Sequence, residues 1–212
     1  MSVSHRRGGL YRVLELPRVY ESFQKLLGAH AVRTRFVKEF LRPADGSRLL
    51  DVGCGTGSLL DYLPPGIEYT GYDLNPSYIE AARRRYGSRG RFFVGRVGEE
   101  IAGVGSGCFD IVLAKALLHH LSDDEAHQLL RLSARALVPH GVFVSFDNVF
   151  YDGQPWISRT LIALDRGGKV RTPGEYRGLA AAHFESIEAL LITDMLKIPY
   201  AHFIMRARKG TP

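Results

Sequence analysis

Three glycines at alternate positions follow an apolar run that ends in an acid, Leu49-Leu50-Asp51-Val52-Gly53-Cys54-Gly55-Thr56-Gly57. The apolar run is typical of a buried strand, and glycines let the backbone turn sharply at the strand's carboxyl end, where a Cβ would collide with a ligand. Farther along, Tyr69-Thr70-Gly71-Tyr72-Asp73 forms a second strand-like run that ends in an acid, placed to accept both hydroxyls of a ribose. This pattern of strand, glycine turn, helix, strand and acid predicts a nucleoside-binding half.

The spacing of the glycines separates two kinds of nucleoside site. A dinucleotide site requires G-x-G-x-x-G, with a helix N-terminus facing the pyrophosphate, and here Ser58 stands at the position of the third glycine. Asp51 at the strand tip suits a ligand that carries an ammonium group better than one that carries phosphates. The stretch resembles motif I of the class I S-adenosylmethionine-dependent methyltransferases, and Asp73 falls where that family keeps its ribose-binding acid. The resemblance covers roughly residues 40–147.

The resemblance implies a fold and a cofactor. The fold is α/β, a Rossmann-like doubly wound sheet of seven strands in the order 3-2-1-4-5-7-6, with the last strand antiparallel and with N-terminal helices. The cofactor is S-adenosylmethionine and the product S-adenosylhomocysteine. Members that methylate amide-like nitrogens carry an Asn/Asp-Pro-Pro-aromatic turn after the fourth strand, where this chain has Ala114-Lys115-Ala116-Leu117. The chain is therefore similar to the small-molecule members, including the quinone-biosynthesis type.

Composition agrees with a single enzyme domain. A chain of 212 residues with 45% hydrophobic content suits one domain, residues 1–212, with N-terminal helices over residues 1–45. The two cysteines, Cys54 and Cys108, make no disulfide framework, so the cytoplasm is the expected compartment. No apolar stretch approaches the length that spans a bilayer, and no membrane contact is expected. We expect no metal site and a monomer or homodimer.

The formal charge of +6 and a pI near 9.4 raise the question of nucleic-acid binding. The basic excess is concentrated before residue 50, where cations alternate with apolar residues at helical spacing. Amphipathic helices with solvated basic faces account for this pattern, and a basic composition alone is a common false signal for RNA binding. Nucleic acid is therefore not the expected partner.

Strand and helix signals alternate along the chain, as an open parallel sheet requires. Asn75-Pro76 supplies an N-cap and a first-turn proline, and Ser122 and Thr172 each begin a capping box. We expect strands at residues 91–95, 109–114, 142–147, 187–192 and 200–207, and helices at residues 76–86, after Ser122, and from Thr172 to about His183. The last two strands should form an antiparallel hairpin.

Residues around the glycine turn and the neighbouring strand ends are the candidates for binding the cofactor. Leu74 is expected to pack on one face of the adenine. The family keeps an acid for the adenine amino group after the third strand, where this chain has Arg96, so adenine recognition is expected from main-chain groups near Val97 or from Glu99 or Glu100. The full candidate set is Asp51, Gly53, Cys54, Gly55, Gly57, Asp73, Leu74, Arg96, Val97, Ala114, Lys115 and Tyr20, of which Lys115 is expected to contribute by its backbone and Tyr20 to close over the methionine end.

The catalytic candidates follow strands four and five. Open α/β sheets place ligands beyond the carboxyl ends of their strands, and His119, His120 and Asp147 lie there. Histidine titrates near the operating pH and is suited to act as a general base. Adjacent side chains in an extended segment point in opposite directions, so at most one of the two histidines is expected to face the site.

Residues 148–171 form the one long segment without a clear period, which in a compact domain is usually a functional loop. We expect it to be a substrate-loop insertion. Cations around a Gly-Gly turn, including Lys169, would clamp a carboxylate or phosphate, since guanidinium groups match both; the alternative is a solvated loop. The candidate substrate residues are Asn148, Trp156, Arg159, Arg166 and Arg171.

The sequence thus predicts transfer of a methyl group from S-adenosylmethionine to a small-molecule acceptor, with oxygen favoured over nitrogen or carbon. The expected acceptor is a metabolite or sugar-type substrate that can carry an anionic group. Catalysis would come from holding the nucleophile against the methyl carbon while a base removes its proton. Two alternatives remain open, a tRNA or rRNA methyltransferase and a catalytically inactive S-adenosylmethionine-binding regulatory protein.

Overall fold

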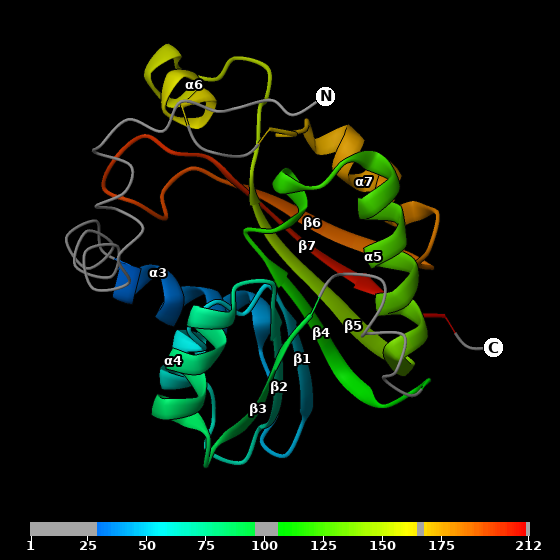
Figure 1. Ribbon diagram of the computed structural model, residues 1–212. Helices are drawn as coiled ribbons and strands as arrows, with labels where there is room; N and C mark the ends of the chain where they lie inside the picture. Colours follow the sequence, from blue (N-terminus) through cyan, green and yellow to red (C-terminus); the bar gives the residue numbers. More distant parts are fainter. Residues whose placement is uncertain (1–28, 96–105, 165–167, 211–212) are drawn as a thin grey trace, which may run out of the picture.

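The computed structural model describes residues 29–95, 106–164 and 168–210 (Figure 1). Helices and strands alternate through most of this length, and the chain ends in a pair of strands. The helical elements are α3 (Ala29–Arg35), the π-helical turn η1 (Phe36–Leu41), the 3₁₀ turns η2 (Ser58–Tyr62) and η4 (Leu118–His120), α4 (Pro76–Tyr86), α5 (Asp123–Ala136), α6 (Trp156–Ala163) and α7 (Pro173–Ala181). The strands are β1 (Arg48–Val52), β2 (Glu68–Asp73), β3 (Gly90–Val94), β4 (Phe109–Lys115), β5 (Leu137–Asn148), β6 (Ser186–Ile192) and β7 (His202–Arg208).

The strands form one seven-stranded sheet in the order β3-β2-β1-β4-β5-β7-β6. The pairs from β3 through β5 are parallel, whereas β7 runs antiparallel to both β5 and β6. The strand order, the parallel central strands and the antiparallel hairpin at the end of the chain confirm the predicted fold class.

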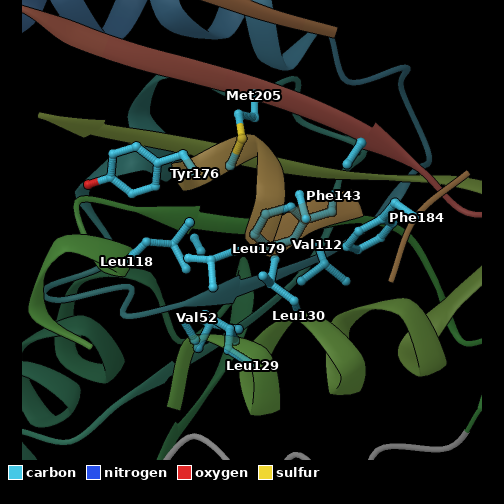
Figure 2. Packing of buried hydrophobic residues seen from close by; sticks show 14 of the residues in the cluster. Val52, Val112, Leu118, Leu129, Leu130, Phe143, Tyr176, Leu179, Phe184 and Met205 are labelled. Carbon is cyan, nitrogen blue, oxygen red and sulfur yellow. The ribbon is translucent and has the colours of Figure 1, made fainter. Parts of the chain in front are cut away.

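Helices cover both faces of the sheet because the central strands are apolar on both sides. In β4, Ile111 and Leu113 point to one face, and Val112 and Ala114 to the other. One core lies between the sheet and the helices α5 and α7, with Leu129 and the other residues labelled in Figure 2. The second core lies under η1, η2 and α4 on the opposite face. This is the doubly wound arrangement.

The predicted helix starts are confirmed. The Asn75 side chain accepts a hydrogen bond of 2.9 Å from the Ser77 amide, and Pro76 occupies the first turn of α4. Ser122 forms a reciprocal capping box with Glu125 at the start of α5, and Thr172 does so with Glu175 at the start of α7. Because these caps are local, the sequence alone is enough to predict them.

Three expectations need correction. The segment after the glycine turn is the short 3₁₀ turn η2 rather than a regular helix. Strand β5 begins at Leu137, not at Val142, because the Pro139-His140-Gly141 turn is absorbed as a register shift between the pairs Phe109↔Leu137 and Ile111↔Val142. The segment 148–171 is not irregular throughout, since it contains α6.

The parallel pairing brings the ends of four strands to one edge of the sheet. Asp73 is the last residue of β2, Lys115 of β4 and Asn148 of β5, and the glycine turn follows β1. Figure 1 shows that α6 lies beyond the carboxyl end of β5. Polar groups that are far apart in the sequence therefore meet where open α/β sheets bind their ligands.

We predict opposite effects on stability for the same substitution at two glycines. A Cβ added at Gly71 would lie 2.8 Å from Cys54 Sγ and 3.0 Å from Tyr69 Cε1, whereas a Cβ at Gly178, in the exposed middle of α7, would meet no atom within 4 Å. Gly71→Ala should lower the free energy of unfolding by about 1–3 kcal/mol through overpacking, and Gly178→Ala should raise it by roughly 0.5–1 kcal/mol through helix propensity. Urea denaturation measures both; equal effects of the two substitutions would contradict the packing around Gly71.

Candidate functional site

The glycine turn is held by hydrogen bonds to its neighbours. Gly53, Gly55 and Gly57 have φ angles of 79°, 56° and 70°, in the left-handed region that other residues rarely adopt. The amides of Gly53 and Cys54 donate to the Tyr72 carbonyl at 2.8 and 3.0 Å, which ties the turn to β2.

The three glycines face different surroundings. A Cβ at Gly55 would meet nothing within 4 Å, whereas a Cβ at Gly57 would lie 2.8 Å from the Phe92 ring. At Gly53 the nearest atom is a methyl group of Leu117, at 3.4 Å, so the segment after β4 packs against the turn. Gly55 therefore presents an open backbone face to a ligand, and Gly57 is required by internal packing as well as by its backbone angle.

Asp73 fixes the turn from the end of β2. Its Oδ2 accepts a 2.8 Å hydrogen bond from the Gly55 amide, and its Oδ1 accepts one of 2.8 Å from the Asn75 amide. Each carboxylate oxygen keeps further acceptor capacity. Leu74, directly after it, is 60% exposed. The geometry suits an acid that accepts hydroxyl groups next to an apolar surface on which a ring can lie.

Asp51 is a buried acid with one satisfied oxygen. It is 3% exposed, and its Oδ2 accepts a 2.6 Å hydrogen bond from the Tyr69 hydroxyl. Among the described residues, no polar group bonds to the buried Oδ1. Burial raises the pKa of Asp51 to about 6, against the lowering effect of the Tyr69 hydrogen bond. An ammonium group would satisfy Oδ1 and favour the ionised acid, so this residue fits the amino acid end of S-adenosylmethionine.

The Lys115 amine interacts electrostatically with two acids of the site. Its Nζ lies 5.3 Å from the centre of the Phe146 ring. Burial lowers the pKa of Lys115 to about 8, as does the charge of Arg33, while the charges of Asp51 and Asp147 oppose this shift. The side chain is therefore part of the electrostatics of the site, in addition to the backbone contribution expected from the sequence.

His119 and Asp147 form a buried pair across the ends of β4 and β5. Asp147 Oδ1 lies 2.8 Å from His119 Nδ1 and 3.3 Å from the His119 amide, and the two residues are 4% and 2% exposed. A carboxylate only accepts hydrogen bonds, so in the neutral imidazole Nδ1 carries the proton and Nε2 is the acceptor. This is the tautomer that a general base requires.

His120 lies beside His119 instead of opposite to it. The two ring centres are 4.1 Å apart. The expectation that the side chains point in opposite directions is wrong, because residues 118–120 form a 3₁₀ turn and are not extended. His119 is buried against Asp147 and His120 is exposed, so the structure gives the two histidines different environments.

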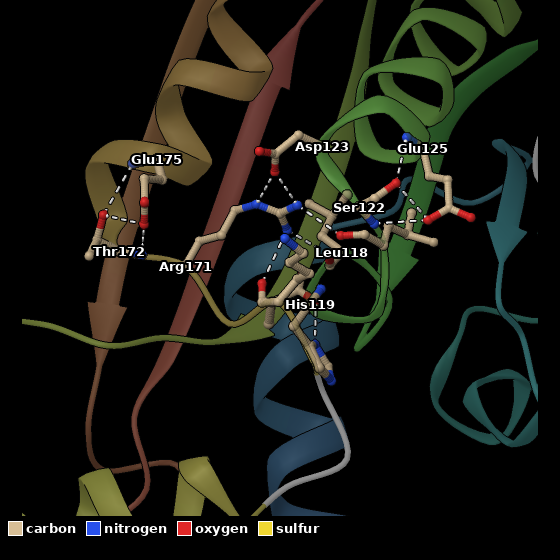
Figure 3. A network of polar contacts seen from close by, with 11 residues as sticks. Leu118, His119, Ser122, Asp123, Glu125, Arg171, Thr172 and Glu175 are labelled. Atoms are coloured by element: carbon tan, nitrogen blue, oxygen red, sulfur yellow. Dashed lines mark hydrogen bonds and ion pairs between the residues drawn. The ribbon is translucent and has the colours of Figure 1, made fainter. Parts of the chain in front are cut away.

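The role expected for Arg171 also needs correction. The residue is 6% exposed, and its guanidinium donates to the Leu118 and Leu121 carbonyls at 2.8 Å each and to Asp123 Oδ1 at 2.7 Å (Figure 3). These groups belong to the protein itself. Arg171 therefore does not belong to the set of cations that we expected to bind an anionic acceptor.

The other candidates in residues 148–171 have varied surroundings. Asn148 is buried at the end of β5 and donates from Nδ2 to the Tyr200 hydroxyl at 3.0 Å. Trp156, at the start of α6, is 76% exposed, and the Arg159 guanidinium lies 4.9 Å from the centre of the Phe150 ring. The remaining predicted positions lie outside the described residues: Tyr20, Arg96, Val97, Glu99, Glu100 and Arg166.

Two contributors were missed in the sequence. Tyr69 supplies the hydrogen bond to Asp51, and Gly71 gives Cys54 the space that it needs on β2. The sequence did contain a signal for Tyr69, because a buried acid on a strand requires a hydrogen-bond donor on the same face of the neighbouring strand. Asp51 pairs with Gly71, and Tyr69 lies two residues before Gly71 and therefore on the same face.

The described residues contain no group of three or more His, Cys, Asp and Glu side chains that could hold a metal ion. None of the helices in the described part of the chain is long and apolar enough to cross a bilayer.

Sequence comparisons agree on one type of domain. Residues 49–141 match the model of a methyltransferase domain. The chain is 32% identical over 125 residues to the human thiol S-methyltransferase TMT1A, covering 57% of this chain and 50% of that protein. It is 37% identical over 122 residues to the ubiquinone biosynthesis O-methyltransferase of Xanthomonas axonopodis pv. citri, covering 56% of this chain and 50% of the relative. The chain spans about half the length of these curated relatives.

A solved structure extends the similarity to nearly the whole fold. The human N-acetylserotonin methyltransferase in complex with S-adenosylmethionine superimposes with a TM-score of 0.68 at 18% identity. The match covers 92% of this chain and 55% of that protein. At this level of identity the similarity shows the fold alone.

We predict that Asp51 makes the protein less stable as the pH rises through the acidic range. Its pKa is raised by burial from 3.8 to about 6, so the folded state binds a proton more tightly than the unfolded state. The contribution of Asp51 to the free energy of unfolding is then most favourable below pH 4, decreases between about pH 4 and 6, and is constant above, with a total decrease of about 3 kcal/mol. The Asp51→Asn variant should not show this decrease. In urea denaturation, the difference in the free energy of unfolding between the variant and the wild type should therefore grow in favour of the variant as the pH rises.

Asp110→Asn is the matched control, because the Arg48 hydrogen bonds lower the pKa of Asp110. Here the ionised form is the favoured one. The stability that Asp110 contributes is present above its unfolded pKa and is lost as the pH falls, so the two variants should show opposite trends. Parallel trends would contradict the environment described for Asp51.

Proposed function

We propose that this chain is a class I S-adenosylmethionine-dependent methyltransferase that transfers a methyl group from the sulfonium of S-adenosylmethionine to a hydroxyl group of a small molecule, in line with the methyltransferase domain that residues 49–141 match. The observation that carries this proposal is the buried His119–Asp147 pair, which favours the tautomer with an unprotonated Nε2 in a neutral His119, on the segment that packs against the glycine turn. A base in this place can accept a proton from an acceptor held beside the cofactor.

The residues around the glycine turn fit the parts of the cofactor. Asp73 would accept the ribose hydroxyls, Leu74 would contact the adenine, and the open backbone at Gly55 would leave room for the ligand. The buried Oδ1 of Asp51 would accept from the amino group, directly or through water. When bound, the cofactor supplies a methyl group on a positively charged sulfur, which is ready for attack by a nucleophile.

The chain's own contribution to the reaction is positioning and proton transfer. His119 Nε2 would accept the hydroxyl proton of the acceptor as the acceptor oxygen takes the methyl group that the bound cofactor supplies. Asp147 holds the proton on Nδ1 and stabilises the imidazolium that results. Holding both reactants in a buried site supplies the remaining acceleration.

An oxygen acceptor is favoured by the presence of a built base. Phenols and alcohols are weakly acidic and require removal of a proton, whereas a thiol with a pKa of about 8.5 already ionises partly near neutral pH. Similarity to the ubiquinone biosynthesis O-methyltransferase of Xanthomonas axonopodis pv. citri supports an oxygen acceptor. Similarity to the human thiol S-methyltransferase TMT1A supports a sulfur acceptor. A phenolic metabolite is therefore the first acceptor class to test and a thiol the second.

We predict that Asp73 governs cofactor affinity. Asp73→Ala should weaken S-adenosylhomocysteine binding by about 1.5–3 kcal/mol, the range for hydrogen bonds to a charged group. Calorimetry measures this loss, and NAD should not bind to the wild type. Because Asp73 also holds the Gly55 amide, a substitution at Gly55 is not a suitable control. Asp110→Ala, which removes a carboxylate that pairs with Arg48 near the start of β4, should leave binding unchanged. Tight NAD binding, or full affinity in Asp73→Ala, would refute the proposed site.

We predict that His119 is the base and that His120 is not. His119→Ala should lower kcat by at least about a hundredfold with cofactor affinity nearly unchanged, because loss of a general base acts on the chemical step. His120→Ala is the neighbouring control and should retain most of the turnover. Formation of S-adenosylhomocysteine is measured with two acceptor panels, catechols and phenols in one and small thiols in the other. The loss should be larger for phenols than for thiols.

The outcomes separate the alternatives. Full turnover of His119→Ala on phenols would refute the proposed base. Cofactor binding without turnover on either panel would favour a regulatory protein. Salt-dependent retention on tRNA or rRNA together with RNA methylation would favour the RNA methyltransferase.

A further inference from the structure

We infer that Arg171 is a positioning residue that holds the two halves of the His119–Asp147 pair together. The inference rests on the proposed function, in which His119 is the base. The pair is formed by residues that are 28 positions apart in the sequence, one on the turn after β4 and one at the end of β5. Its geometry therefore depends on what joins these two segments.

Arg171 contacts the turn that carries His119. Nη1 donates to the Leu118 carbonyl at 2.8 Å, and Nη2 donates to the Leu121 carbonyl at 2.8 Å, so the guanidinium bonds on both sides of His119 (Figure 3). The neighbouring Lys169 amide donates to the His119 carbonyl itself at 3.0 Å. Segment 169–171 thus binds the carbonyls of Leu118, His119 and Leu121.

Arg171 also contacts the segment that carries Asp147. Its carbonyl accepts a 3.2 Å hydrogen bond from the Phe150 amide, just beyond the end of β5. Its guanidinium lies 5.8 Å from the centre of the Tyr176 ring, and the Tyr176 hydroxyl donates to the Asn148 carbonyl at 3.1 Å. One residue therefore bonds by its side chain to the histidine turn and by its main chain to the segment that directly follows β5, the strand that carries Asp147.

The guanidinium is anchored on a helix. Asp123 is the first residue of α5, and its Oδ1 accepts hydrogen bonds from Nε and Nη2 of Arg171 at 3.1 and 2.7 Å. With the bonds to the Leu118, Leu121 and Lys169 carbonyls, this makes five hydrogen bonds for the five N–H groups that an arginine has. No donor is left for an anionic acceptor, which separates positioning from substrate binding.

A lysine cannot reproduce this arrangement. The planar guanidinium donates in fixed directions from three nitrogens, whereas an ammonium group is a single point of charge on a flexible stem. Arg171→Lys should therefore keep the positive charge beside Asp123 but loosen the histidine turn. Arg177→Lys is a matched control, because the Arg177 guanidinium also donates to two backbone carbonyls, those of Ile187 and Ala189 on β6, away from the histidine turn.

The first test is spectroscopic and needs no acceptor. In protein labelled with ¹⁵N at its histidines, the Nδ1 proton of His119 should give a downfield NMR signal that is absent from His119→Ala. In Arg171→Lys this proton should exchange with water at least about tenfold faster, since opening of the turn exposes it. Arg177→Lys should leave the signal unchanged.

Several results would overturn the inference: an unchanged His119 signal in Arg171→Lys, an equal change in Arg177→Lys, or the lack of any such signal in the wild type. If Arg171→Lys does not fold, Asp123→Asn serves in its place. That substitution removes the ionic anchor and keeps the bonds to the carbonyls, so it should accelerate the exchange to a smaller degree. No acceleration in a folded Asp123→Asn would count against the inference.

The second test is kinetic, with the phenolic acceptor that gives the highest turnover in the panel. Arg171→Lys should lower kcat by about ten- to a hundredfold while the acceptor KM stays nearly constant, because misplacement of a catalytic group acts on the chemical step. In the His119→Ala background the same substitution should have no further effect, whereas a general loss of structure would add to the loss. Full turnover of His119→Ala with altered exchange in Arg171→Lys would refute the proposed base and leave the positioning role intact.

Discussion

The parallel pairing of β1 with both β2 and β4 determines where the polar groups around the glycine turn lie. Asp51 pairs with Gly71 on one side and with Leu113 on the other, so the ends of all three strands are level. The glycine turn, Asp73 and the segment after β4 then emerge side by side. A shift of one residue in either pairing would turn Asp51 from one face of the sheet to the other. The register of the central strands is therefore a requirement for the site as well as for the core.

The charges of the site are set by the same burial that stabilises the fold. Asp51 is driven toward its neutral form and Lys115 toward its neutral amine, because both lie among apolar side chains at the strand ends. Such environments cost stability, which the two cores on either side of the sheet must offset. A ligand with a positive charge near Asp51 would reverse part of this cost, so binding and the ionisation of Asp51 are coupled. The site is thus built to gain from a cationic ligand.

Local signals in the sequence were sufficient for much of the structure. The glycine turn, the caps at Asn75, Ser122 and Thr172, and the strand order were predicted because each depends on neighbouring residues or on a familiar motif. The π-helical turn η1 and the bulge within β5 were not, since packing against other elements decides them. The wrong expectation for the two histidines arose from treating a 3₁₀ turn as extended.

Arg171 shows most plainly why a site cannot be read from residue types alone. Its position in a cationic loop suggested that it binds an anion. Its side chain instead bonds to backbone carbonyls and to an acid, among them the Leu121 carbonyl and the Asp123 carboxylate, which lie about 50 positions earlier in the chain. Nothing local in the sequence marks those partners. The consequence reaches beyond one residue, because residues 148–171 now have two separable parts. Segment 169–171 supports the histidine turn, while α6, with its exposed Trp156, projects beyond the end of β5. A loss of activity after a substitution in this segment therefore does not by itself indicate contact with the acceptor. Only a change in the acceptor KM at constant His119 geometry would do so.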